Sequence, residues 1–319
     1  MLHLVARIYY LVIVRMPLPV AKDPLPESVL RRPLAIAHRG ASGFAPENTL
    51  AAFKLAVALG VDGVEMDVQL SADGHPVVIH DTRVNRTTNG TGVISRLTLD
   101  QLQGLDAGSW FERRLTRRPR LRMMSRRVSA EVGGDFQTFS NETVPTLEAV
   151  LSLLAGSGLE RIYVELKGSP TTRQALLEAV LSLVRTLRVE RLVTLLSFDH
   201  AIVRTAKEIS GGIRTAATFP ARGRRLISTR SIVRAAEYAN VDEVALHFGL
   251  ATRRAVETFH EHGLSVSVWT ANSKLVMRPL VACGVDSIMT NFPNRLREVL
   301  FSPSARRLSG LSRGRRRRS

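Results

Sequence analysis

From Leu34 onward, short runs of β-branched and aliphatic residues alternate with amphipathic segments of helical period. Eight of these runs have the composition of buried strands, and they are LAIA, VEMDV, YVEL, VTLLSF, RTAATF, VALHF, SVSVW and SIMTN. The segments between them include NTLAAFKLAVALG and TRRAVETFHEHG, each ending in the glycine that often follows a helix. A strand and helix repeated eight times predict an α/β fold, a (β/α)8 TIM barrel. An open doubly wound sheet is the less favoured alternative.

A ninth strand-like run, PVVIHD, follows the second strand after only SADGH. Because this link is too short for a parallel crossover, we expect an antiparallel β-hairpin at the mouth of the barrel. A two-residue turn at Asp73-Gly74 would place Asp67 opposite His80. Glu65 shares the face of Asp67 through the two-residue period of a strand. We therefore expect these three side chains to converge at the C-terminal end of a barrel strand, where such enzymes keep their chemistry.

Positive charge is concentrated in two segments. Lys and Arg total 45 against 28 Asp and Glu, which gives a formal net charge of +17. Residues 113–127 carry eight Arg and residues 306–319 carry seven, with no acid in either segment, so the rest of the chain is near neutral. We expect an Arg-rich insertion over residues 113 to about 140, whose composition favours disorder. Both segments are candidates for contact with an anionic surface or a nucleic acid.

The predicted organisation has three parts: an N-terminal extension at 1–33, the barrel domain at 34–303, and a basic disordered tail at 304–319. The apolar start of the chain is interrupted by Arg7 and is shorter than the roughly 20 residues of a membrane span. The single Cys283 excludes an intramolecular disulfide and is typical of a reducing compartment. We expect a cytoplasmic protein, with export through the apolar N-terminus left open.

His38 and Arg39 end the first predicted strand. A proton-transfer group beside a forked cation suits phosphoryl chemistry. An isolated His-Arg pair is more often satisfied by hydrogen bonds to loop carbonyls. A catalytic role for this pair is therefore supported only by the other residues at the strand ends.

Acidic residues end the next two predicted strands. Glu65 and Asp67 would repel each other if both were buried without a cation. With Glu165 they make an all-oxygen ligand set, which suits Mg²⁺ or Ca²⁺ rather than zinc. Lys167 faces the same way as Glu165 and offers either a phosphate contact or a salt bridge to one of these acids.

Six motifs in series resemble the glycerophosphodiester phosphodiesterase family. In family order they are His38-Arg39-Gly40, Pro46-Glu47-Asn48-Thr49, Glu65-Met66-Asp67, His80-Asp81, Glu165-Leu166-Lys167 and Val268-Trp269-Thr270. That family has a TIM-barrel fold, binds a divalent metal through the E-x-D acids and a later Glu, and uses two His as acid and base. The resemblance runs from about Leu34 to Leu300.

The resemblance implies roles for the residues that match its motifs. The implied metal ligands are Glu65, Asp67 and Glu165. The implied acid and base are His38 and His80, and which is which stays open. The implied phosphate contacts are Arg39 and Lys167.

Three further residues have weaker assignments. Trp269 would contact the glycerol part of the substrate, or it is simply a core residue. Glu47 and Asn48 follow Pro46, so an ordinary helix start is the alternative to a role in the site. The resemblance favours the site.

The implied activity is metal-dependent hydrolysis of glycerophosphodiesters to sn-glycerol 3-phosphate and an alcohol, in glycerophospholipid breakdown. The alternative is a lysophospholipase-D-like phosphodiesterase that acts on lysophospholipids. A non-catalytic barrel that binds anionic lipid or nucleic acid is less favoured, because the matching His and acidic residues are intact. The Arg-rich insertion departs from the family pattern and is expected to affect access or the preferred alcohol group. The nucleophile, water or the substrate's own hydroxyl, stays open.

Overall fold

The computed structural model describes residues 32–133, 138–140, 142–168, 171–221 and 227–301. The expected basic tail and, apart from Arg32 and Pro33, the expected N-terminal extension lie outside the described residues. Within the described ranges, no helix has both the length and the apolar character needed to cross a membrane.

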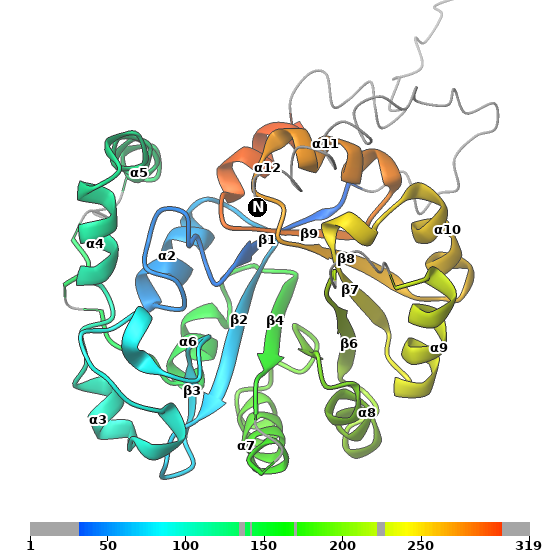
Figure 1. The fold of residues 1–319 in the computed structure, drawn as a ribbon, viewed down its shortest axis with the longest axis horizontal. Coiled ribbons are helices and arrows are strands. Elements are labelled where there is room, and N and C mark those ends of the chain that lie inside the picture. The colour runs from blue at the N-terminus through cyan, green and yellow to red at the C-terminus, as the bar shows by residue number, and fades with distance from the viewer. Residues whose placement is uncertain (1–31, 134–137, 141, 169–170, 222–226, 302–319) are drawn as a thin grey trace, which may run out of the picture.

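Parallel strands close into a barrel (Figure 1). In the described part of the chain they are β1 (Leu34–His38), β2 (Gly63–Leu70), β4 (Arg161–Leu166), β5 (Val193–Ser197), β6 (Arg214–Phe219), β7 (Glu243–His247), β8 (Ser265–Trp269) and β9 (Ser287–Thr290). The sheet has no open edge among these strands, because β1 pairs with both β2 and β9. Their apolar sequences follow from burial on both faces, between the barrel interior and a layer of helices. The (β/α)8 barrel predicted from the sequence is confirmed.

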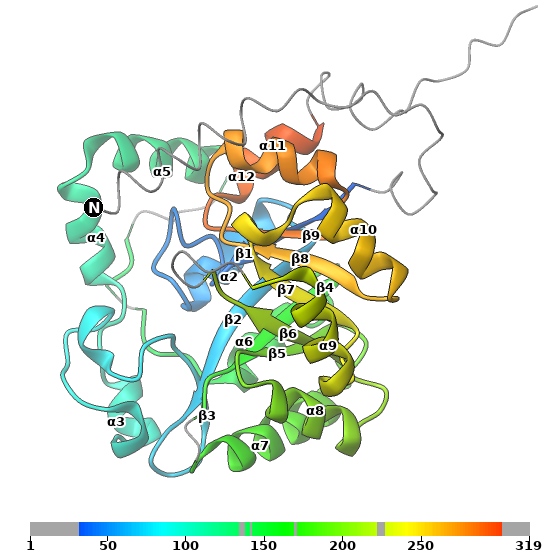
Figure 2. The ribbon, with the colours of Figure 1, turned by 45° about the vertical axis from the view of Figure 1, so that its right-hand side comes forward.

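Helices surround the strands (Figures 1 and 2). They are α2 (Leu50–Ala58), α6 (Leu147–Leu154), α7 (Arg173–Thr186), α8 (His200–Ile209), α9 (Thr229–Ala239), α10 (Arg253–Glu261), α11 (Lys274–Cys283) and α12 (Pro293–Phe301). Side chains such as Thr49 and Thr252 cap helix N-termini by accepting a backbone N–H. Gly60 and Gly263 adopt the left-handed φ values of 64° and 72° just past α2 and α10. These ends are where the sequence predicts them.

The short strand β3 (Pro76–Val78) pairs antiparallel with β2, which confirms the predicted hairpin. The predicted register is wrong by one residue. Val68 lies opposite Val78, and the N–H of Ile79 donates to the carbonyl of Asp67 at 2.9 Å. Asp67 therefore does not lie opposite His80, which follows the end of the strand.

The turn itself explains this shift. Ser71 closes a loop of three residues instead of two, because its backbone N–H donates to the carbonyl of His75 at 3.0 Å. Its hydroxyl donates to the carboxylate of Asp73 at 2.6 Å, and Gly74 takes a positive φ of 84°. An extra residue in the turn moves every later residue of the partner strand by one position.

The Arg-rich insertion is helical where it is described. After α3 (Leu99–Gln103), the chain forms α4 (Ser109–Thr116) and α5 (Pro119–Glu131), which lie outside the helical layer on one side of the barrel (Figures 1 and 2). The expectation of disorder is therefore wrong for residues 113–133, and residues 134–137 and 141 lie outside the described part. Phe111 and Leu115 are buried four residues apart on α4, Val128 is buried on α5, and Arg is itself a good helix former. The expectation of disorder came from the charged composition of this segment, which does not show that its apolar residues lie on one face of a helix.

A Val-Asp step recurs at the N-terminal end of the barrel, before β2, β7 and β9. In each step the Asp backbone N–H donates to the carbonyl of a residue in a neighbouring strand, and the Asp carboxylate accepts the N–H of that same residue at 2.7–2.8 Å. The pairs are Asp62 with Ala35, Asp242 with Thr215, and Asp286 with Val266. Each carboxylate also pairs with a cationic or imidazole side chain, and these are Arg32, Lys207 and His260. We call these three arrangements the Val-Asp clamps.

Candidate active site

His38 ends β1 and lies in the mouth of the barrel, with its side chain only 14% exposed. Its Nδ1 lies 2.7 Å from Oδ1 of Asn291, and its Nε2 lies 3.7 Å from a carboxylate oxygen of Glu65. Burial, with help from the charge of Arg39, lowers the pKa of His38 to about 4. The ring is therefore neutral near pH 7.

Asn291 is a site residue that the sequence analysis missed. It directly follows β9, and its carbonyl accepts the N–H of Gly43 at 2.7 Å. A Cβ at Gly43 would lie 2.4 Å from that carbonyl oxygen, so only glycine permits this approach. The loop after β1 and the end of β9 thus hold the Asn291 amide against the ring of His38.

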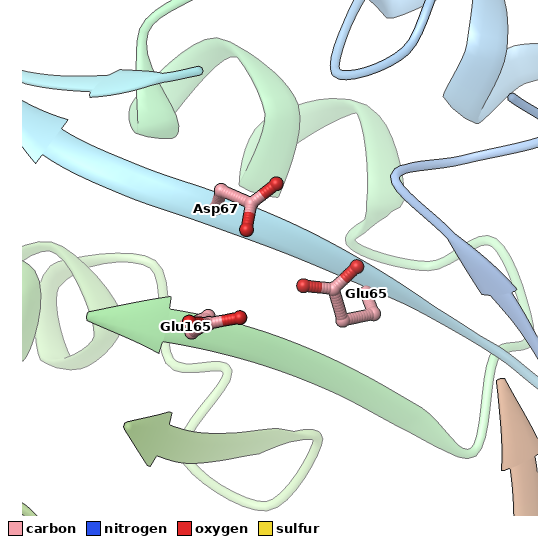
Figure 3. A group of neighbouring side chains, drawn as sticks. All are labelled: Glu65, Asp67 and Glu165. Carbon is pink, nitrogen blue, oxygen red and sulfur yellow. The ribbon is translucent and has the colours of Figure 1, made fainter. Parts of the chain in front are cut away.

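Glu65 and Asp67 on β2 and Glu165 on β4 turn their carboxylates toward one another (Figure 3). One oxygen from each lies within 4.8 Å of the others, and all three residues are buried. The register of the two strands places Asp67 beside Glu165. The shared face and the grouping predicted from the sequence are confirmed.

The three acids cannot all be charged without strong repulsion. Burial and the charges of Asp67 and Glu165 raise the pKa of Glu65 well above its usual range. Burial also raises the pKa of Glu165, to about 7. Burial would do the same to Asp67, but the charges of Arg39 and Lys167 outweigh it and lower the pKa of Asp67.

This group fits a hard divalent cation. Oε1 of Glu65 is buried and has no hydrogen-bond partner among the described residues, and Oδ1 of Asp67, likewise buried, has only an ion pair with Lys167 Nζ at 3.2 Å. A buried carboxylate oxygen without a donor is costly, and a cation bound to oxygen ligands removes that cost. The described site is therefore able to hold a metal ion.

Two cations border the triad. The backbone N–H of Arg39 donates to Glu65 at 3.0 Å, and its guanidinium lies 3.0 Å from Asp67. Lys167 Nζ donates to Glu165 at 2.7 Å and lies 3.2 Å from Asp67. Both of the predicted phosphate contacts therefore lie at the acidic cluster.

Glu47 and Asn48 also lie in the site. Thr49, not either of these residues, caps α2. The Asn48 amide donates to Asp67 at 2.8 Å, and Glu47 accepts from the Arg39 guanidinium at 2.8 Å.

His80 approaches from the hairpin side. Burial lowers its pKa, while the charge of Asp67 and the hydrogen bond to Asp81 oppose that effect. Its Nδ1 lies 2.6 Å from Asp81, whose other oxygen accepts from Arg86 at 2.6 Å. The hydrogen bond from Arg86 is the main cause that lowers the pKa of Asp81 to about 2. Arg86, like Asn291, was not identified from the sequence.

Aromatic side chains form one wall of the mouth. The ring of Trp269, at the end of β8, packs edge-on at 5.5 Å from Phe198 and 5.7 Å from His247. Its indole N–H donates to the carbonyl of Ala245 at 3.1 Å. His247 therefore lies beside a predicted substrate contact. His200 bonds to the backbone carbonyl of Thr218.

A sequence profile of the glycerophosphoryl diester phosphodiesterase family matches residues 38–295. The chain belongs to this family. Its members are phosphoric diester hydrolases, so the enzyme class and the family predicted from the motifs are confirmed.

Two curated relatives match over nearly their whole length. The chain is 37% identical to a putative glycerophosphodiester phosphodiesterase of Bacillus subtilis over 81% of this chain and 94% of the relative. It is 32% identical to a glycerophosphodiester phosphodiesterase of Caldanaerobacter subterraneus over 82% of this chain and 96% of the relative.

Solved structures give the same result. A phosphodiesterase of Oleispira antarctica, in complex with the product sn-glycerol-3-phosphate, matches with a TM-score of 0.70 and 28% identity, over 85% of this chain and 98% of that one. A putative glycerophosphoryl diester phosphodiesterase of Silicibacter pomeroyi matches with a TM-score of 0.71 and 28% identity, over 85% and 95%.

Proposed function

We propose that this protein hydrolyses glycerophosphodiesters to sn-glycerol 3-phosphate and an alcohol, as a step in the breakdown of glycerophospholipids. The observation that carries the proposal is the meeting of His38, His80 and the acidic triad at one barrel mouth. The product bound to the Oleispira relative supports the same substrate class.

Glu65, Asp67 and Glu165 would hold the metal, and we propose Mg²⁺ or Ca²⁺ because all the ligands are oxygens. A divalent ion supplies Lewis-acid polarisation of a phosphoryl oxygen when bound. Arg39 and Lys167 would bind the remaining phosphate charge, since both are held at the triad by ion pairs.

The two histidines have different partners, which assigns their roles in this proposal. Nδ1–H of His38 donates to the Asn291 amide oxygen, so its Nε2 keeps a lone pair and the ring acts as the general base on the attacking water or substrate hydroxyl. Nδ1 of His80 pairs with the Asp81 carboxylate, which fixes the ring and leaves its other nitrogen available, so we assign His80 to protonate the leaving alkoxide. Trp269 would pack against the glycerol part of the substrate.

One assay tests the reaction and its alternative. The measurement is release of glycerol 3-phosphate from glycerophosphocholine, and of lysophosphatidic acid from lysophosphatidylcholine, each with and without a chelator. We expect turnover of the first substrate that stops in chelator. Turnover confined to the second would replace our proposal with the lysophospholipase-D-like activity, and turnover of neither would refute both.

The α4–α5 pair supports a second role, contact with an anionic surface. Its exposed arginines are Arg113, Arg117, Arg118, Arg120, Arg122, Arg126 and Arg127. Ser125 on the inner side of α5 donates to the carbonyl of Phe44 at 3.0 Å, in the loop that follows His38 and Arg39. We propose that these exposed arginines attract anionic lipid headgroups beside the mouth.

Sedimentation with vesicles tests this contact. Binding to vesicles that contain phosphatidylserine should fall steeply with salt and should weaken when Arg122, Arg126 and Arg127 are changed together to Gln. Salt-sensitive binding to DNA without binding to vesicles would reject a lipid surface in favour of a nucleic acid.

A further inference from the structure

We propose that Arg86 is a positioning residue that links His80, the proposed general acid, to Arg39, the proposed phosphate contact. The inference rests on the proposed function, because it takes His80 as the acid and Arg39 as a phosphate contact. Arg86 ends a short 3-10 turn (Val84–Arg86), and its side chain is 44% exposed at the rim of the mouth. It reaches the chemistry through two carboxylates.

The first carboxylate is Asp81. Arg86 Nε donates to one Asp81 oxygen at 2.6 Å and Nη2 to the other at 3.1 Å. The oxygen that accepts from Nη2 also lies 2.6 Å from Nδ1 of His80. Because Asp81 is held on both oxygens, it fixes the orientation of the imidazole and keeps the proton on Nδ1. The other ring nitrogen is then free to meet the leaving group.

The second carboxylate is Glu47. Arg86 Nη1 and Nη2 each donate to one Glu47 oxygen at 2.8 Å, the parallel geometry of a bidentate pair. The oxygen that accepts from Nη2 also accepts from Arg39 Nη1 at 2.8 Å. Glu47 thus holds Arg39 from one side, while Asp67 lies 3.0 Å from Nε of Arg39.

One planar guanidinium therefore completes a continuous chain of hydrogen bonds: His80, Asp81, Arg86, Glu47 and Arg39. Three of its nitrogens are used, and Nη2 bonds to both carboxylates. A lysine places its donors on a single nitrogen and cannot hold two carboxylates in this geometry. The charge alone would not preserve the arrangement.

Kinetics separate the two branches. We expect Asp81→Asn to act mainly on kcat, because it disturbs the acid, and Glu47→Gln to act mainly on KM, because it disturbs the phosphate cation. Arg86→Ala should lower kcat and raise KM together, with kcat/KM reduced about 10–100-fold, the usual effect of losing an outer partner. Arg86→Lys should recover little of that loss.

Two measurements exclude a merely structural role. Guanidinium ion added to Arg86→Ala should restore part of kcat/KM, since the side chain lies at an open rim, while thermal unfolding stays near that of the wild type. In the Asp81→Asn, Glu47→Gln background, Arg86→Ala should have almost no further effect, because the partners through which it acts are already lost.

Arg83 offers a matched control on the same turn, since it is exposed and its guanidinium bonds to Asn85. Arg83→Ala should leave kcat and KM unchanged. If the wild type is active and kcat/KM of Arg86→Ala lies within about twofold of the wild-type value, the inference is overturned but the proposed function stands. If Arg86→Ala lowers kcat/KM as much in the Asp81→Asn, Glu47→Gln background as in the wild type, Arg86 contacts the substrate directly and the inference is overturned. No turnover by the wild type would refute the proposed function itself.

Discussion

Three aspartates at the N-terminal end of the barrel are held by partners within the protein, whereas the carboxylates of the triad at the C-terminal end face one another. In the Val-Asp clamps, Asp62, Asp242 and Asp286 each accept a backbone N–H and pair with a cationic or imidazole side chain. In the triad, Glu65 keeps a buried oxygen that lacks a hydrogen-bond partner in the described structure, and the buried Oδ1 of Asp67 has only its ion pair with Lys167. The same barrel therefore places acids in two opposite electrostatic settings.

The difference separates stability from chemistry. A carboxylate that is satisfied within the protein contributes to folding and has little left to offer a ligand. A carboxylate that is buried beside other carboxylates lowers stability, and it can be satisfied by a bound cation. In barrels of this kind the C-terminal end carries the reaction and the N-terminal end carries stability. Four predictions test this division, from the largest effect to the smallest.

The largest effect is expected at the triad. Asp67→Ala should lower kcat/KM by about 10³-fold or more, because it removes a proposed metal ligand and so several kcal/mol of charge stabilisation. Calorimetric titration with Mg²⁺ or Ca²⁺ should show that binding is lost while the circular dichroism spectrum stays native. Full activity of the wild type in chelator would contradict this prediction.

The histidines come next. His38→Ala and His80→Ala should each lower kcat by about 10²-fold or more, the usual cost of losing an acid or a base. Both variants should still bind the metal, because the three carboxylates remain. Near-normal turnover of either variant would remove that histidine from the mechanism.

At the opposite end, Asp242→Ala should leave kcat unchanged and lower the free energy of unfolding by about 1–3 kcal/mol. It loses the bonds to Thr215 and Lys207, and hydrogen bonds to a charged group have about this value. Urea denaturation measures the loss. A fall in kcat with no change in stability would contradict the division between the two ends.

The smallest effect is a pH dependence of stability. The hydrogen bond to Asp286 raises the pKa of His260 above its ordinary 6.5. The stabilisation is therefore complete below about pH 6.5 and is lost as the pH rises through the folded-state value. We expect under about 1 kcal/mol, because the pair is partly exposed. Melting temperatures between about pH 6 and pH 8 should fall less steeply in His260→Gln than in the wild type.

Much of the barrel and of its site followed from local patterns. A two-residue period is enough to put Glu65 and Asp67 on one face, and strand order along the chain brings Glu165 beside them. What depends on tertiary contact did not follow. Arg86 meets Glu47 across 39 residues and Asn291 meets His38 across 253, and no local spacing predicts either pair.

The two errors have local physical causes. The hairpin register failed because the Ser71 hydroxyl bonds to Asp73 and supports a longer turn, whereas the Asp-Gly pair alone favours a shorter one. The insertion was read by its charge, although Phe111 and Leu115 are four residues apart and mark one buried helical face.

The closure of β1 against β9 brings the first and last described elements together, with the Arg32 guanidinium 5.0 Å from the centre of the Phe301 ring. Both lie at the end of the barrel where the strands begin, away from the mouth. A short peptide bridge between these points, with new termini opened in a surface loop, would give a circularly permuted enzyme whose active site is intact. For the same reason, a protein immobilised on a solid surface through either point would keep its barrel mouth exposed to the solution.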